Sequence, residues 1–149
     1  MMSRVYLGLG SNLGNREENI LRAVKKIHEL IGTVECQSAL FDTEPWGFSS
    51  ENRFLNAVVR VKTALSPRQV LETTKKIEKS LGRRKKSQTK NGRAVYHDRI
   101  IDIDILLYDD ITVDEPDLKI PHPLMYERDF VMIPLQEVLE KDCDGAKAH

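Results

Sequence analysis

The sequence predicts a mixed α+β fold in which an antiparallel sheet carries helices on one face. Four segments are rich in β-branched and other apolar residues over lengths typical of strands. Between them, two segments repeat apolar residues at helical spacing and begin with residues that cap helices. The chain has 149 residues, 40% hydrophobic and 31% charged, which favours one globular domain, 1–149, with a sizeable core.

The first half of the chain contains three predicted strands and one helix. Residues 4–9 form the first strand, and the helix begins after Asn15 and ends at Gly32. The second strand is expected over 34–41 and the third over 53–63, with a loop rich in Pro, Gly and Ser between them. Alternation in the third strand places Leu55, Ala57, Val59 and Val61 on one face and Phe54, Asn56 and Val58 on the other.

The second half begins with a helix that has Ser66 as N-cap and ends at Gly82. A basic loop and an aspartate-bearing strand follow, and then a short strand at 111–113 and a proline-rich passage. Short helical pieces are expected from Leu124, and 141–149 is expected to be a flexible tail. The order strand, helix, strand, strand, helix, strand is the split βαβ, or ferredoxin-like, arrangement.

Composition excludes several classes of protein. No apolar run approaches the ~20 residues of a membrane span, and the N-terminus lacks the features of a signal peptide. Cys36 and Cys143 are far apart and have no metal-binding spacing, so two free thiols are expected. The formal net charge is zero, whereas nucleic-acid binders are more often basic over a whole face. We therefore expect a cytoplasmic monomer that binds neither membrane nor nucleic acid.

Positive charge is concentrated in one segment. Residues 83–99 contain seven Lys or Arg and one acidic residue. A basic segment in an otherwise acidic chain indicates a site for a small anion. Arginine binds phosphate bidentately and lysine binds it as a point charge, so a phosphorylated ligand is one candidate, although a solvated loop would also explain the composition.

Asp102 and Asp104 interrupt the apolar strand over 100–108. Residues two apart on a strand share a face, about 6.6 Å apart, so their repulsion at an effective dielectric near 20 is about 2.5 kcal/mol. Carboxylates suit Mg²⁺, which also binds substrate phosphates, and two such ions can assist a displacement at phosphorus. Solvated surface aspartates are the alternative. The predicted register places Asn56 on the same open face.

Several stretches, in order along most of the chain, resemble the 6-hydroxymethyl-7,8-dihydropterin pyrophosphokinase family. They are YLGLGSNLGNR, TEPWGFSSENRFLNAVV, IEKSLGR, RIIDIDILLYDD and IPHPLMYERDFVMIPL. The resemblance implies a ferredoxin-like fold and transfer of diphosphate from ATP to the pterin hydroxymethyl group, with release of AMP, in folate biosynthesis.

The resemblance also implies roles for individual residues. Asp102 and Asp104 would bind two Mg²⁺ ions, with ATP as co-substrate, and would act in catalysis together with Arg83 and Arg99. The implied ATP-binding residues are Lys75, Glu78, Arg83, Lys85, Arg99 and His122. The implied pterin-binding residues are Thr43, Trp46, Phe54, Asn56 and Phe130.

Two other functions are consistent with parts of this pattern. Ferredoxin-like domains can bind RNA, and the basic segment could follow its backbone, although the aromatic pattern of such sheets is missing. A Mg²⁺-dependent nucleotidyltransferase would also use paired aspartates. Such an enzyme releases pyrophosphate, whereas diphosphate transfer releases AMP, so the products distinguish the two reactions.

Overall fold

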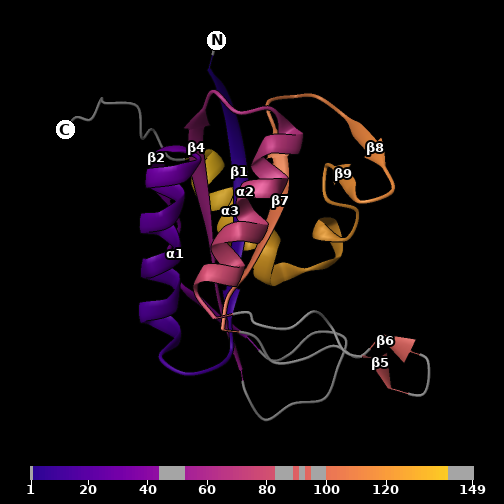
Figure 1. The fold of residues 1–149 in the computed structure, drawn as a ribbon. Helices are drawn as coiled ribbons and strands as arrows, with labels where there is room; N and C mark the ends of the chain where they lie inside the picture. The colour runs from indigo at the N-terminus through magenta and orange to yellow at the C-terminus, as the bar shows by residue number, and fades with distance from the viewer. Residues whose placement is uncertain (1, 44–52, 83–88, 91–92, 95–99, 141–149) are drawn as a thin grey trace, which may run out of the picture.

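The computed structural model describes residues 2–43, 53–82, 89–90, 93–94 and 100–140. Within these residues the fold is mixed α/β, and an antiparallel sheet lies at its centre (Figure 1). The sheet contains β1 (Ser3–Ser11), β2 (Gly32–Gln37), β3 (Phe41–Thr43), β4 (Phe54–Thr63) and β7 (Asp102–Tyr108).

The strand order is β2–β4–β1–β7, and β3 pairs with β4 beyond the end of β2. All of these pairs are antiparallel. The central strand β1 therefore lies between β4 and β7, which are the strands that carry Asn56 and the aspartate pair.

The strand expected over 34–41 is two strands in the structure, β2 and β3. Ser38 lies at the break, where its amide donates to Val58 O at 2.9 Å and its Oγ accepts from Val58 N at 2.9 Å. Because one residue satisfies both backbone groups of Val58, the chain leaves the regular pairing without leaving buried polar groups unsatisfied.

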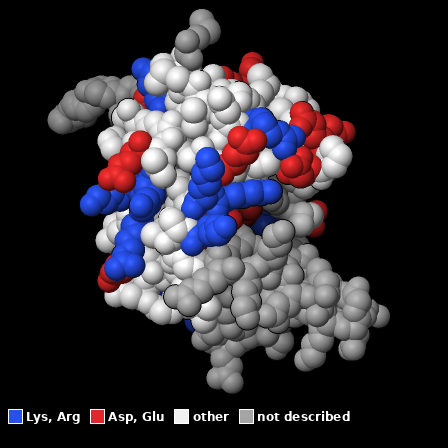
Figure 2. Space-filling view, in the orientation of Figure 1, with Lys and Arg blue, Asp and Glu red and all other residues white. Residues whose placement is uncertain are grey.

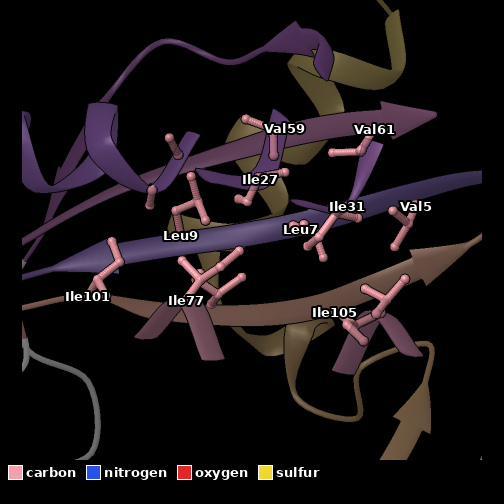
Figure 3. Close-up of a cluster of buried hydrophobic side chains, with 14 of the residues drawn as sticks. Val5, Leu7, Leu9, Ile27, Ile31, Val59, Val61, Ile77, Ile101 and Ile105 are labelled. Carbon is pink, nitrogen blue, oxygen red and sulfur yellow. The ribbon is translucent and has the colours of Figure 1, made fainter. Parts of the chain in front are cut away.

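Helices α1 (Arg16–Leu30) and α2 (Pro67–Ser80) cover one face of the sheet (Figure 1). Both predicted helices and their N-caps are confirmed, since Asn15 accepts from Glu18 N and Ser66 forms a capping box with Gln69. The first helix ends at Leu30, and Gly32, its expected end, begins β2. Between these helices and the sheet lies a core of aliphatic side chains (Figure 3). It includes Val5, Leu7, Leu9, Ile27, Ile31, Val59, Val61, Ile77, Ile101 and Ile105.

The opposite face is also covered, by α3 (Asp129–Glu140), which follows the short 3₁₀ turn η1 (Met125–Glu127). The expectation of helices on one face only is therefore wrong. Of the short helical pieces expected from Leu124, η1 is short, whereas α3 is a helix of twelve residues. Toward one end of the sheet this second face is apolar, and Val58 and Leu106 bury there against α3. Covering that apolar area is the physical reason for a twelve-residue helix at this position.

A hairpin of β8 (Val113–Glu115) and β9 (Leu118–Ile120) precedes η1. The short strand expected over 111–113 thus begins later, and the proline-rich passage supplies its partner. Arg68, in the first turn of α2, donates to Asp117 at 2.7 Å and so fastens the hairpin to that helix.

Three other expectations concern the remaining parts of the chain. In the basic segment, β5 (Thr89–Lys90) pairs with β6 (Arg93–Ala94). Cys36 is disulfide-bonded, so the expectation of a free thiol is wrong there, and Cys143 lies outside the described residues. Among the described residues no helix is long and apolar enough to cross a membrane.

Candidate active site

A strip of bare backbone runs along β1 on the α3 side of the sheet. Gly10 pairs with Asn56 of β4 on one side and with Asp102 of β7 on the other. Two residues further back, Gly8 pairs with Asp104 in the same way. Residues directly opposite each other in antiparallel strands project to the same face, so Asn56 and the two aspartates flank a strip without side chains.

The strip is narrow at Gly10. A Cβ atom at this position would lie 3.1 Å from Asn56 Oδ1 and 3.5 Å from Phe54 Cδ1. Any residue other than glycine would therefore push against the side chains of β4 and cover the backbone between Asn56 and Asp102.

Asp102 and Asp104 are half-buried and alternate with buried isoleucines, Ile101, Ile103 and Ile105, that pack against α1 and α2. The structure confirms that both carboxylates project to the face opposite these helices, as strand alternation predicts. Asn56 lies on that same face, which confirms the register expected from the sequence.

Glu78 reaches the aspartate strand from the helical side. Its side chain is buried, and Oε2 accepts from the backbone amide of Ile103 at 2.7 Å. Because β7 lies at the edge of the sheet, this contact satisfies an amide that no further strand pairs. Glu78 thus fixes the backbone between Asp102 and Asp104.

On β4, Asn56 is oriented by its neighbour β3. Asn56 Nδ2 donates to Phe41 O at 3.2 Å, and Phe54 pairs directly with Thr43. Three of the implied pterin-binding residues, Thr43, Phe54 and Asn56, are therefore brought together where β3 meets β4.

His122 and Phe130 approach from the segment that leads into α3. The His122 amide donates to Leu106 O at 3.1 Å, and its Nδ1 accepts from Leu124 N at 3.2 Å. Burial lowers the pKa of His122 and the positive charge of Arg128 lowers it further, whereas Asp102 opposes both. His122 is thus attached to β7 through Leu106, and the charge of Asp102 acts on its imidazole.

Arg128 is a residue that the sequence reasoning missed. Its guanidinium carbon lies 5.7 Å from the centre of the Phe130 ring, within the range of a cation–π contact. Its position two residues before Phe130 was the available signal, because the segment just before a helix often carries functional groups.

Lys75 lies apart from this group of residues. It is exposed on α2, and its charge acts on Asp117 of the β8–β9 hairpin. Figure 2 shows that other lysines gather over the same helix, whereas acidic side chains gather near the hairpin. Trp46, Arg83, Lys85 and Arg99 lie outside the described residues.

The face of the glycine strip offers two carboxylates, those of Asp102 and Asp104. Among the described residues, no cluster of three or more His, Cys, Asp or Glu ligands is found. Two carboxylates are too few for a metal cage built from protein alone. They are the usual number for Mg²⁺ that shares its coordination with substrate phosphates, so the donor set fits that ion.

Paired carboxylates, a histidine and an arginine on one face of an antiparallel sheet are typical of the class of enzymes that act on phosphorylated substrates. Comparison with known proteins identifies the member of this class. The chain belongs to the 7,8-dihydro-6-hydroxymethylpterin-pyrophosphokinase (HPPK) family, whose model matches residues 6–140.

Relatives named 2-amino-4-hydroxy-6-hydroxymethyldihydropteridine pyrophosphokinase support this assignment. The Porphyromonas gingivalis protein is 48% identical over 138 residues, which cover 92% of this chain and 91% of that protein. The Aquifex aeolicus protein is 42% identical, with coverage of 92% and 81%. The Bacillus subtilis protein is 37% identical, with coverage of 99% and 86%.

Solved structures support the fold. Plasmodium falciparum HPPK-DHPS with pteroate has a TM-score of 0.68 at 18% identity. The match covers 91% of this chain but 38% of that longer chain. At this level of identity the likeness concerns the fold alone.

Proposed function

We propose that the glycine strip of β1 is the place where this chain transfers the pyrophosphoryl group of ATP to 6-hydroxymethyl-7,8-dihydropterin. Family membership supplies the reaction, which belongs to folate synthesis. The observation that carries the proposed location is the row Asn56–Gly10–Asp102. This row puts an amide suited to a heterocycle and a carboxylate suited to a metal on two sides of one buried glycine.

The β4 side of the strip is the proposed pterin site. A pterin is flat and has hydrogen-bonding groups along its edge, so it needs aromatic faces and a fixed polar group. Phe54 and Asn56 offer both from one strand, and Thr43 lies beside them. Phe130 is partly buried in the first turn of α3, and we propose that it forms part of the same pocket together with Trp46.

The β7 side is the proposed site of ATP and of two Mg²⁺ ions held by Asp102 and Asp104. When bound, the ions supply positive charge that neutralises the phosphates and the two carboxylates. The charges of Asp102 and Arg128 both act on His122, and we propose that His122 and Arg128 donate to phosphate oxygens on this side. By resemblance, we assign Lys75, Glu78, Arg83, Lys85 and Arg99 to ATP as well, and Arg83 and Arg99 to catalysis.

The chemistry needs little beyond positioning. The hydroxymethyl oxygen forms a bond to the β-phosphorus of ATP, while the bond from that phosphorus to the oxygen of AMP breaks. Charge spreads over the phosphoryl oxygens, so alignment and electrostatic stabilisation provide most of the rate enhancement. Asn56 holds one reactant and the aspartate strand holds the other, and the two strands β4 and β7 that carry these residues flank β1.

We also propose that the fold is ferredoxin-like and that the chain acts as a single cytoplasmic domain and as a monomer. The order β2–β4–β1–β7, with a helix after β1 and after β4, supports the first point. The packing of helices from both ends of the chain on one sheet supports the single domain.

The test is product analysis with Mg²⁺, ATP and 6-hydroxymethyl-7,8-dihydropterin. We expect AMP and pterin diphosphate in equal amounts, and a loss of about a hundredfold or more in kcat for Asp102→Asn and for Asp104→Asn. Asp110→Asn is the matched control, because it removes an exposed carboxylate just beyond the same strand.

Each alternative outcome is informative. Release of pyrophosphate in place of AMP would identify a nucleotidyltransferase. Full activity in a folded Asp102→Asn protein would refute the proposed location of the site. RNA binding that weakens steeply with salt, in a protein that forms no AMP, would favour the binding-module alternative.

A further inference from the structure

We infer that Arg16 is a positioning residue for the pterin side of the site, because it fixes the strand that orients Asn56. This inference rests on the proposed function, in which Asn56 contacts the pterin. Arg16 is the first residue of α1 and lies on the helical side of the sheet. Arg16 ends the stretch YLGLGSNLGNR, but neither the motifs nor the resemblance assigns it a role.

Three residues form a closed ring of contacts behind β3 and β4. Arg16 Nη2 pairs with Asp42 Oδ2 at 3.3 Å, and Arg16 Nη1 donates to the backbone oxygen of Arg53 at 3.0 Å. Arg53 Nε completes the ring by donating to Asp42 Oδ1 at 2.8 Å. One helix residue thus holds both β3 and the residue that precedes β4.

The ring shares one carboxylate between two guanidinium groups. Hydrogen bonds from Arg53 and Arg16 hold the pKa of Asp42 below its usual range, so Asp42 is charged at neutral pH. All three side chains are partly exposed, and such pairs individually stabilise a protein only slightly. The ring is therefore more important for where β3 lies than for overall stability.

The two faces of β3 have different tasks. Asp42 lies opposite Leu55, whose side chain is buried in the core under α1 and α2. Its neighbours Phe41 and Thr43 lie opposite Asn56 and Phe54, on the face of the glycine strip. A contact on the helical side of β3 therefore determines the position of the groups on the substrate side.

The connection to the pterin site is one hydrogen bond. Asn56 Nδ2 donates to Phe41 O at 3.2 Å, so the position of β3 determines the orientation of the Asn56 side-chain amide. Since β3 has only three residues and pairs with β4 alone, few backbone bonds hold it in place. Loss of the Arg16 contacts frees β3 to shift, and the Asn56 amide shifts with it.

The test is steady-state kinetics of Arg16→Gln and Arg16→Lys. For both variants we expect the KM for the pterin to rise about three- to tenfold, with the KM for ATP and kcat nearly unchanged. Lysine restores the charge but cannot reach Asp42 and Arg53 O together, so it should not rescue the KM. The double variant Arg16→Gln/Asp42→Asn should be no worse than the poorer single variant, because both changes break the same ring.

Arg22→Gln is the matched control. Arg22 also lies on α1 and pairs with a carboxylate, Glu18 at 2.8 Å, but it is one to two turns away from Arg16. The control should leave the KM for the pterin unchanged. If Arg16→Gln does not fold, Asp42→Asn breaks the ring from the other side and takes its place.

A spectroscopic measurement tests the link without turnover. The side-chain amide of Asn56, assigned by its disappearance in Asn56→Ala, should change chemical shift in Arg16→Gln and not in Arg22→Gln. An unchanged shift and an unchanged pterin KM would overturn the inference, and so would full rescue by lysine. If Asn56→Ala itself leaves the pterin KM unchanged in an active enzyme, the assigned pterin site is wrong, whereas a raised KM there with a normal Arg16→Gln refutes only the role of Arg16.

Discussion

A carboxylate held between two guanidinium groups makes part of the stability of this protein dependent on pH. The pKa of Asp42 is lowered in the folded state, mainly by hydrogen bonds from Arg53 and Arg16. Its contribution is therefore present above the unfolded pKa, about 3.9, and is lost as the pH falls through the lower folded value. The loss begins only in the acid range.

We predict that Asp42→Asn lowers the free energy of unfolding by about 1 kcal/mol or less at neutral pH, and that this difference shrinks in acid. Urea unfolding of both proteins at about pH 6 and about pH 2.5 measures it. Asp110→Asn, at an exposed position, serves as the control. A difference that grows in acid would contradict the assignment of the ion pairs.

Residue patterns in the sequence predicted the faces of the strands but not the contacts between distant residues. Alternation sufficed to place Asn56, Asp102 and Asp104 on one face, because the side-chain period of a strand is two. The contact of Arg16 with Asp42 joins residues 26 apart, and no local period signals it. Arg128 was missed for the same reason, since its relation to His122 depends on the path of η1.

At the scale of elements, a buried carboxylate, Glu78, links α2 to β7 in addition to their apolar packing. We predict that Glu78→Ala lowers the free energy of unfolding by about 1–3 kcal/mol, because the Ile103 amide remains buried without this acceptor. Glu78→Gln keeps an acceptor oxygen and should lose less. Glu72→Ala, at an exposed position of the same helix, should lose the least.

Urea unfolding measures these stabilities, and the KM for ATP measured in parallel separates a structural role from a role in binding. A Glu78→Ala protein as stable as the unmodified one would show that β7 does not need this contact. A raised KM for ATP in Glu78→Gln would support the role that the family resemblance implies.

The predictions of helices and strands were wrong where contacts between distant residues determine the structure. The caps of α1 and α2 are local and were predicted from sequence. The division of one expected strand into β2 and β3 depends on Ser38, which bonds to Val58 on another strand. No local signal in 34–41 reveals that partner.

At the scale of the whole molecule, the sheet has two cores, and the second was not expected. Leu135 of α3 is 1% exposed against Val58 and Leu106, whereas Ile133 on the same helix is 52% exposed. This core was not predicted, because the sheet face that α3 covers also carries the polar site residues. That face was therefore expected to be open to solvent.

We predict that Leu135→Ala lowers the free energy of unfolding by about 2–5 kcal/mol, through lost burial and the cavity that remains. Ile133→Ala should change it by about 0.5 kcal/mol or less, because that side chain is exposed. Chemical denaturation of the two variants measures the difference. Equal stability would mean that α3 does not contribute a core.

In the glycine strip of β1, folding and catalysis make opposite demands on the sequence. Glycine inside a strand is less favourable than a residue with a side chain by about 0.5–1 kcal/mol, and Gly8 and Gly10 lie in the central strand of the sheet. Selection for stability alone would fill Gly8, where a Cβ would meet Leu106 only at ordinary contact distance, 3.4 Å, whereas a Cβ at Gly10 would lie 3.1 Å from Asn56 Oδ1. A substitution that fills the glycine strip at Gly8 would thus stabilise the protein but would cover the backbone on which the proposed activity depends.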